Sequence, residues 1–284
     1  MPRNTKPDPR ILFDVVTTAG RHIRNNFRNP GTIIELKADG SPVTDVDMAV
    51  HNELMDYAGN FGMGYISEEG NGSIEGDYIL YLDPLDGTSS FRAGIPTVTI
   101  AVSVMKRMTG LWYKPVTSLV HDPLTGWSWF CDSDQSFFTV ERSLVNAQEA
   151  NVTQSARALI TTIFPPGPLR ELRYVRDRIN SNQPYMKHQS CGSLALCGGL
   201  IASGMTHGLI FGGGSAAEVC AMIPILEGAG ATVSDLAGKP LEGFELGDHK
   251  GKVDFVLPNG FIAASDSELW RTLYTLVEEE RAGM

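Results

Sequence analysis

The most informative stretch of the chain is residues 78–88, which read YILYLDPLDGT. Its first five residues are apolar or aromatic, and they predict a buried strand that ends at Asp83. Pro84 has no N–H group and a fixed φ, so the backbone leaves the sheet stiffly. Gly87 allows a turn with exposed amides, and Thr88 adds a hydroxyl where a helix could begin. The stretch therefore predicts a strand that delivers two carboxylates to one sheet edge.

The two carboxylates, Asp83 and Asp86, are close enough in the chain to repel one another. A divalent cation relieves such repulsion. Hard cations such as Mg²⁺ bind carboxylate, carbonyl and water oxygens, and a substrate phosphate completes the shell. The alternative is a capped turn with two solvated aspartates, and the spacing alone favours neither interpretation.

A second acidic pair, Glu68 and Glu69, follows a short strand at Tyr65 and Ile66. Taken alone, this pair is better explained as a solvated loop. If its strand lies beside that of residues 78–82, however, four carboxylates converge on one edge of the sheet. Clustered anions without a metal ion would destabilise the fold. Together, the two pairs favour a metal site.

These segments resemble the paired signatures of the inositol monophosphatase family, the lithium-sensitive phosphatases that also include bisphosphate nucleotidases and fructose-1,6-bisphosphatases. The resemblance is carried by residues 66–69 and 83–88, and it is supported by residues 42–47 and 228–240. It spans residues 10–275. It implies an α+β and α/β chain folded as a layered αβαβα sandwich of the inositol monophosphatase / fructose-1,6-bisphosphatase type.

The resemblance also implies roles for individual residues. The metal ligands that it implies are Glu68, Asp83, Leu85 through its carbonyl, and Asp86. Thr88, with Asp47 behind it, would orient and deprotonate the attacking water, and Glu69 would complete the catalytic set. Backbone amides of Gly87 and Thr88 would receive the phosphate. Lys37 falls near the site. The expected cofactor is Mg²⁺, with Mn²⁺ as a substitute, and two ions about 4 Å apart would clamp the attacking water and the leaving oxygen.

One departure from the family pattern concerns a further metal ligand, the aspartate of a Trp-Asp pair. An ungapped count back from Gly228 places Ala217 and Glu218 at this pair. Glutamate keeps the charge but adds one methylene, and Mn²⁺ tolerates altered geometry better than Mg²⁺. We expect Glu218 to remain a ligand. The alternative is a solvated glutamate on an amphipathic helix.

Two further departures lie on the substrate side. Phe211 stands where inositol-hydrolysing members carry a glutamate that accepts substrate hydroxyls. In the pocket, it would favour a less hydroxylated or stackable leaving group, and otherwise it packs in the core. Ser193 lies in a stretch similar to the family's Gly-Thr-Ala. The full set of expected substrate contacts is Asp86, Gly87, Thr88, Ser193, Phe211 and Glu218.

The composition bounds the partners. The chain has 33 acidic and 23 basic residues and a formal net charge of −10, which disfavours a nucleic-acid polymer or an anionic membrane as partner. Its four cysteines form no Cys-x-x-Cys pair and are expected to be reduced thiols. The sequence shows no signal-peptide core and no apolar run long enough to span a membrane. A cytoplasmic protein is therefore expected, and the family resemblance adds a homodimer.

The hydrophobic pattern divides the chain into two halves. Residues 1–145 form an α+β half that carries the metal site, and residues 146–284 form an α/β half that completes the substrate pocket. Helices are expected over residues 11–27, 45–57, 170–180, 194–203, 216–226 and 267–281. Strands are expected over residues 32–37, 65–66, 78–82, 97–105, 112–120, 126–131, 158–163, 185–188, 208–211, 232–234 and 261–264.

The sequence thus predicts a metal-dependent phosphatase that hydrolyses a small phosphate monoester, such as a sugar phosphate, an inositol phosphate or a related metabolite. A bisphosphate nucleotidase or sugar bisphosphatase is one alternative. Another, from a different class, is a non-catalytic metal- and phosphate-binding descendant. Asp47, Thr88 and both acidic pairs favour the enzyme, because a binding protein would not need the water-activating set. The glycines at 212–214 lack the Lys-Ser/Thr of a P-loop, and no His-x-x-x-His pair indicates zinc.

Overall fold

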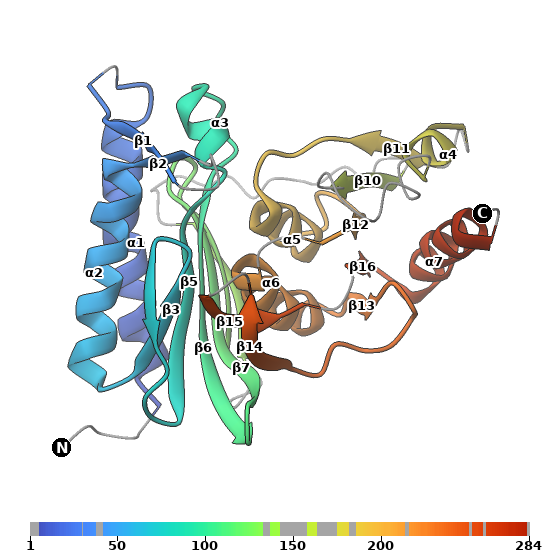
Figure 1. Cartoon of the computed structure of the whole chain (residues 1–284). Coiled ribbons are helices and arrows are strands. Elements are labelled where there is room, and N and C mark those ends of the chain that lie inside the picture. Colours follow the sequence, from blue (N-terminus) through green and yellow to red (C-terminus); the bar gives the residue numbers. More distant parts are fainter. Residues whose placement is uncertain are drawn as a thin grey trace.

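The structure is a computed structural model in which the chain forms five layers, α, β, α, β and α (Figure 1). It describes residues 6–29, 31–37, 42–132, 137–142, 158–163, 175–181, 186–213, 216–249, 252–257 and 260–282. The predicted αβαβα sandwich is confirmed.

The first layer consists of α1 (Pro9–Asn26) and α2 (Asp45–Phe61), which pack side by side on one face of the large sheet (Figure 1). Pro9 at the first helical position and the Asp8 side chain, which accepts from Arg10 N at 2.9 Å, begin α1. Apolar residues recur every three or four positions, so that one face of α1 is buried. The buried apolar residues of this face are Leu12, Val16, Ala19 and Ile23.

The large sheet joins β15, β14, β7, β6, β5, β3 and β4 in this order, and β8 and β9 extend it from β7. The bounds are β3 (Gly64–Ser67), β4 (Gly70–Ser73), β5 (Tyr78–Asp86), β6 (Thr99–Thr109), β7 (Trp112–Asp122), β8 (Trp127–Asp132), β9 (Phe137–Arg142), β14 (Phe244–His249) and β15 (Lys252–Val256). The strands β3 and β5 are parallel neighbours, with Ser67 opposite Leu82. Their carboxyl ends therefore lie at one edge, as expected for the two acidic pairs.

A bulge shapes the end of β5. The expectation that this strand ends at Asp83 is wrong, because β5 continues to Asp86. Asp83 pairs with Ala101 and Asp86 with Thr99, so β5 has one residue more than β6 between these pairs. Pro84 lies within the interval and has no N–H to donate to the ladder. Bulges re-aim side chains, and this one redirects the last residues of β5.

The middle layer consists of α5 (Leu194–Ala202) and α6 (Ala216–Gly228), which separate the two sheets (Figure 1). The helix α6 contacts β5, β6 and β7 on one side and β13 on the other. Both helices are apolar on nearly all sides, as is typical of helices buried between two sheets.

The second sheet has the order β11, β10, β12, β16 and β13, and it is covered on its outer face by α4 (Val175–Ser181) and α7 (Ser267–Ala282) (Figure 1). Its strands are β10 (Ala158–Ile163), β11 (Met186–Gln189), β12 (Gly208–Phe211), β13 (Thr232–Asp235) and β16 (Phe261–Ala264). The strand β10 is parallel to both β11 and β12, which is typical of an α/β unit. Residues 164–174, where part of the helix predicted over residues 170–180 falls, lie outside the described residues.

Five strands were not predicted, namely β2 (Pro42–Thr44), β4, β9, β14 and β15. The hairpin of β14 and β15 joins the large sheet, with Phe244 opposite Tyr113. A segment from the C-terminal half of the sequence therefore completes the sheet of the N-terminal half. The boundary predicted at residues 145 and 146 lies outside the described residues, so the division into two halves remains a prediction.

Side chains along β5 alternate between the two faces of the large sheet, and each face packs into a different hydrophobic core. Leu80 and Leu82 pack with α1 and α2, whereas Ile79 and Tyr81 pack with the middle helices. Each fully buried side chain of this kind contributes about 1.5–3 kcal/mol to folding. Asp83 continues the second series and therefore points toward the middle layer.

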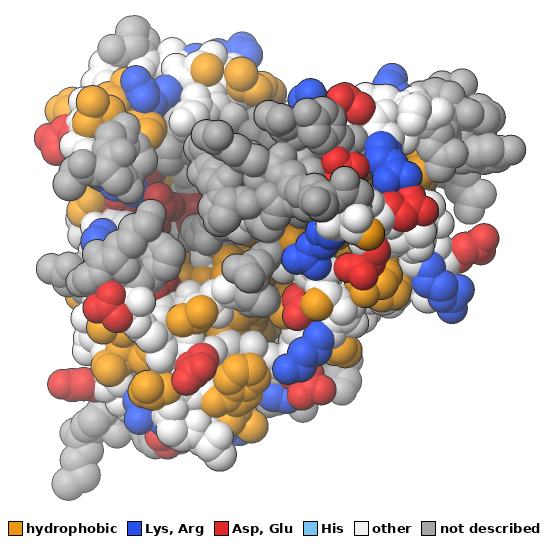
Figure 2. Space-filling view, turned by 45° about the vertical axis from the view of Figure 1, so that its right-hand side comes forward, with side chains coloured by type: hydrophobic (Ala, Val, Ile, Leu, Met, Phe, Trp, Pro, Cys, Tyr) orange, Lys and Arg blue, Asp and Glu red, His pale blue; other side chains and the backbone are white. Residues whose placement is uncertain are grey.

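Two further features of the molecule are the distribution of its surface charges and the composition of its helices. On the face shown in Figure 2, the described acidic and basic side chains are interspersed over the surface. None of the helices in the described ranges has both the length and the apolar composition that crossing a membrane requires.

Candidate active site

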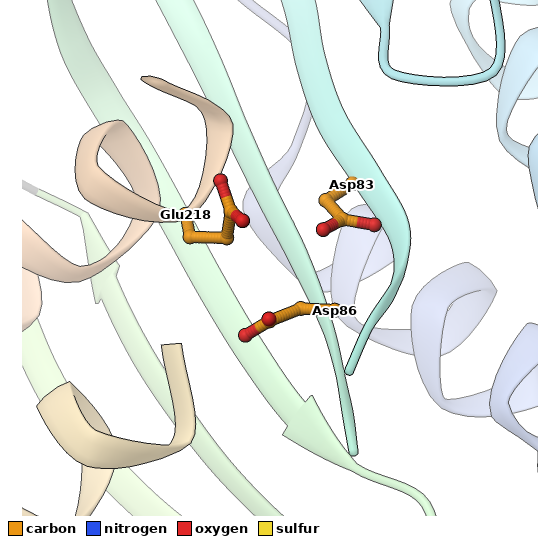
Figure 3. Close-up of side chains that lie close together, drawn as sticks. All are labelled: Asp83, Asp86 and Glu218. Atoms are coloured by element: carbon orange, nitrogen blue, oxygen red, sulfur yellow. The ribbon is translucent and has the colours of Figure 1, made fainter. Parts of the chain in front are cut away.

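Three buried carboxylates meet between the large sheet and α6 (Figure 3). Asp83 and Asp86 come from the end of β5, and Glu218 comes from the first turn of α6. One carboxylate oxygen of each residue lies within 4.8 Å of those of the other two. The three residues are only 2%, 6% and 8% exposed. In the described part of the chain, they form the one cluster of three such side chains close enough to share a metal ion.

The electrostatics of this cluster favour a bound cation. Burial raises the pKa of Asp83 well above its usual value, and the charges of Glu68, Glu218 and Asp86 raise that pKa further. Burial also raises the pKa of Asp86, although a hydrogen bond from Ser193 opposes the shift. A divalent cation would offset the repulsion, and Mg²⁺ prefers a donor set of oxygens. The residues present therefore fit a hard divalent cation.

Asp86 is held by donors from two other elements. Its Oδ2 accepts from Ser193 Oγ at 2.6 Å, from Ala195 N at 2.8 Å and from Thr99 Oγ1 at 3.2 Å. Its Oδ1 accepts from Leu194 N at 3.3 Å. The two amides begin α5, where the helix dipole also favours a negative charge. Asp86 thus ties the large sheet to the middle layer.

A hydroxyl and a carboxylate form the next part of the site. Thr88, the first residue of the short helix α3 (Thr88–Arg92), lies with its Oγ1 3.1 Å from Asp47 Oδ1 and 3.0 Å from the Leu85 carbonyl oxygen. Asp47 is fully buried, and Thr44 fixes it through a capping box in which the Thr44 amide donates at 2.8 Å. Burial raises the pKa of Asp47, whereas hydrogen bonds from Thr44 and Thr88 lower it.

Lys37 lies between the glutamates of the second acidic pair. Its Nζ is 2.8 Å from Oε1 of Glu68 and 2.8 Å from Oε1 of Glu69. Burial would lower the pKa of Lys37, but the two carboxylates outweigh this effect and raise it. Burial raises the pKa of Glu69 to about 7, against the hydrogen bond from Lys37. The Glu68 side chain is 36% exposed, and the cluster of three carboxylates does not include it.

The backbone between the acids is tightly constrained. The Leu85 side chain is buried in the core beneath α1 and α2, while its carbonyl accepts from Thr88. Gly87 has φ +95°, and a Cβ there would lie 2.6 Å from the Thr97 carbonyl oxygen. Only glycine adopts this conformation so close to a neighbouring backbone carbonyl without strain.

The two departures from the family pattern differ in their surroundings. Glu218 is buried beside Asp83 and Asp86, which excludes the alternative of a solvated glutamate on a helix face. Phe211 is 3% exposed, lies in β12 and packs against Phe261 with ring centroids 5.4 Å apart. This geometry favours the interpretation of Phe211 as a core residue.

The structure changes the interpretation of two positions, Ser193 and Thr99. The sequence predicts Ser193 as a substrate contact, whereas its side chain is fully buried and its hydroxyl points to Asp86. Thr99, for which the sequence predicts no role, contacts both Asp86 and Ser193. Only the register of β6 opposite β5 identifies Thr99, and no local sequence pattern carries that information.

Comparison with known proteins agrees with this geometry. Residues 6–282 match the family described as the inositol monophosphatase family. The bifunctional phosphatase IMPL2 of Arabidopsis thaliana is 27% identical in an alignment of 233 residues that covers 78% of this chain and 62% of that relative. The fructose-1,6-bisphosphatase of Pyrococcus furiosus is 24% identical over 278 residues, covering 94% and 97% of the two chains.

The fold has close counterparts among solved structures. The extragenic suppressor protein SuhB of Bartonella henselae superposes with a TM-score of 0.72 at 20% identity, and the match covers 94% of this chain and 97% of that one. Similarity at this level of identity concerns the fold.

Proposed function

Because the chain belongs to the inositol monophosphatase family and is a phosphoric monoester hydrolase, we propose that it cleaves a small phosphate monoester at the cluster of Asp83, Asp86 and Glu218. The observation that carries this proposal is the convergence of three buried carboxylates near the pair of Thr88 and Asp47. Mg²⁺ is the expected cofactor, and Mn²⁺ the expected substitute.

The carboxylates of the cluster and the Leu85 carbonyl would hold the ion. When bound, the cation polarises the phosphate and lowers the pKa of water. Thr88 donates its hydrogen to Asp47 Oδ1 or to the Leu85 carbonyl, which leaves lone pairs of Thr88 Oγ1 free to accept from the attacking water. When Thr88 donates to Asp47, its proton can pass to Asp47 Oδ1 as the water loses a proton to Oγ1.

The second acidic pair would complete the site. Glu69, with a pKa raised to about 7, can accept or release a proton near neutral pH. Glu68 would act as a ligand through its second carboxylate oxygen, or by exchanging the contact of Oε1 with Lys37 for one with the cation. The amides of Gly87 and Thr88 would receive the phosphate. They lie at the start of α3, and the first N–H groups of a helix have no acceptor within that helix.

The substrate class depends on the leaving group that the site accommodates. We infer a sugar phosphate, an inositol phosphate or a related metabolite. A sugar bisphosphatase or bisphosphate nucleotidase is the second candidate, favoured by the match to a fructose-1,6-bisphosphatase over nearly the whole chain. Against a non-catalytic descendant stands the intact hydrogen-bonded pair of Thr88 and Asp47, which metal binding alone does not need.

A phosphate-release screen tests the proposal. Sugar phosphates, inositol phosphates and bisphosphorylated nucleotides would be compared with Mg²⁺, with Mn²⁺ and with EDTA. Asp86→Asn should lower kcat at least about a thousandfold, because it weakens a metal ligand and its charge compensation. Near-normal turnover by the folded variant would refute the metal assignment.

The cellular setting is part of the proposal. We place the enzyme in the cytoplasm as a homodimer, with the metal site in residues 1–145 and the rest of the pocket in residues 146–284. The acidic composition supports a small-molecule substrate over a nucleic-acid polymer or membrane. Sedimentation of the purified protein tests the dimer, and cell fractionation tests the location.

A further inference from the structure

The two carboxylate oxygens of Asp86 have different surroundings. Oδ2 has donors at 2.6 Å from Ser193, at 2.8 Å from Ala195 and at 3.2 Å from Thr99. A carboxylate oxygen offers about two lone-pair sites, so these donors fill the acceptor capacity of Oδ2. Oδ1 accepts a longer bond, at 3.3 Å from Leu194 N. Oδ1 is therefore the oxygen with capacity for a cation.

The hydroxyls of Ser193 and Thr99 lie next to each other and next to Oδ2 of Asp86. A hydroxyl has one hydrogen, and the 2.6 Å contact shows that Ser193 directs it to Asp86. Thr99 Oγ1 lies 3.0 Å from Ser193 Oγ, so it donates either to Ser193 or to Oδ2 itself. Ser193 Oγ also accepts from Leu196 N at 3.1 Å, which caps α5. Thr99 therefore helps to occupy Oδ2 in both arrangements, either directly or through Ser193.

Neither hydroxyl is accessible to a substrate. Ser193 and Thr99 are both 0% exposed, and they come from the start of α5 and from β6. Their common partner is Asp86, whose carboxylate would otherwise be held only by the amides of Leu194 and Ala195. The burial and the direction of these hydroxyls point to an action through Asp86.

We propose that Ser193 and Thr99 are positioning residues that occupy Oδ2 of Asp86 and thereby aim Oδ1 at the metal site. The inference rests on the proposed function, because it assumes that the carboxylate cluster holds a cation. Removing an outer hydrogen-bond partner of a metal ligand commonly lowers metal affinity about 10- to 100-fold.

Calorimetry of Mg²⁺ and Mn²⁺ binding to the intact protein tests this inference. Ser193→Ala and Thr99→Val should each weaken cation binding about 10- to 100-fold, with Thr99→Val at the lower end. Ser193→Thr keeps the hydroxyl and should bind both cations with an affinity close to that of the wild type. In the phosphate-release assay, the Mg²⁺ concentration for half-maximal rate should rise in both weakened variants, and excess Mg²⁺ should restore the rate.

The control must separate positioning from helix capping, because Ser193→Ala also removes the cap of α5. Ser203 follows the opposite end of α5 and accepts from Trp129 Nε1 at 2.6 Å. Ser203→Ala should lower the melting temperature but leave cation binding unchanged. Thr99→Val leaves the cap intact and provides an independent measurement.

Each outcome decides between defined alternatives. Wild-type cation affinity in Ser193→Ala or in Thr99→Val would remove that residue from the positioning role. Equal weakening in Ser203→Ala would attribute the effect to helix stability and overturn the inference. A wild-type protein that binds neither cation would instead overturn the metal site of the proposed function.

Discussion

Replacing Glu218 with glutamine should have opposite effects on the metal-free and the metal-bound protein. The substitution keeps the size of the side chain but removes one of three negative charges whose oxygens lie within 4.8 Å of one another. Without a cation, that charge repels Asp83 and Asp86. With a cation, it provides part of the attraction.

The size of the effect follows from this geometry. Two unit charges about 4.8 Å apart repel by about 3 kcal/mol at an effective dielectric constant of about 20. We expect Glu218→Gln to stabilise the metal-free protein by about 1–3 kcal/mol, because removing this charge relieves at most that repulsion. Each kcal/mol corresponds to about 2–4 °C in the melting temperature for a chain of this size.

The metal-bound state should respond in the other direction. A cation at a hundred times its dissociation constant stabilises a protein by about 2.7 kcal/mol, and a tenfold loss of affinity reduces this to about 1.4 kcal/mol. The rise in melting temperature on adding Mg²⁺ should therefore be about half as large in Glu218→Gln as in the wild type.

Thermal unfolding in EDTA and in Mg²⁺ measures both effects. Glu227→Gln, an exposed position on the same helix, is the matched control and should change neither value by more than about 0.5 kcal/mol. A Glu218→Gln variant that melts lower in EDTA and gains as much from Mg²⁺ as the wild type would refute the reasoning.

Three further predictions concern other parts of the site. Thr88→Ala should lower kcat by about 10²- to 10⁴-fold with little change in calorimetric Mg²⁺ affinity, and an equal loss of affinity would make Thr88 a ligand. In EDTA, Asp83→Asn should stabilise the protein more at pH 8 than at pH 5, because a carboxyl with a raised folded pKa loses its stabilising contribution as pH rises through that value. An equal gain in stability of Asp83→Asn at pH 5 and at pH 8 would contradict the raised pKa of Asp83. myo-Inositol monophosphate should have a lower kcat/KM than the best substrate of the screen, because Phe211 packs in the core and this position offers no acceptor, and each unpaired hydroxyl costs about 1–3 kcal/mol. Equal values would show that Phe211 does not limit this substrate.

The sequence identifies the acidic edge of the large sheet because its signals are local. The strand of residues 78–82 is short and apolar, and Asp83 follows it directly. The strand at Tyr65 and Ile66 behaves in the same way. Both are parallel neighbours in the sheet, so the expected convergence depends on one pairing that the structure confirms.

Contacts that depend on strand register or on distant segments could not be predicted from the sequence. Thr99 meets Asp86 only because the bulge at Pro84 shifts β5 against β6. The hairpin of β14 and β15 contains Gly247 and Asp248, which interrupt its apolar alternation and conceal its place in the sheet. Glu68 is paired with Lys37, from a segment whose own pattern is too short to specify a contact.

The order in which the ribosome makes these ligands has a consequence for folding. Asp86 leaves the ribosome 107 residues before Ser193, its hydrogen-bond partner, and still earlier than Glu218. At about 5–20 residues per second, the nascent chain carries the aspartates of β5 without their partners for on the order of ten seconds. During that interval, the sheet face that later receives α5 and α6 is open to water. The partly synthesised chain therefore exposes this apolar face, and the three-carboxylate cluster is complete only once Glu218 has been synthesised.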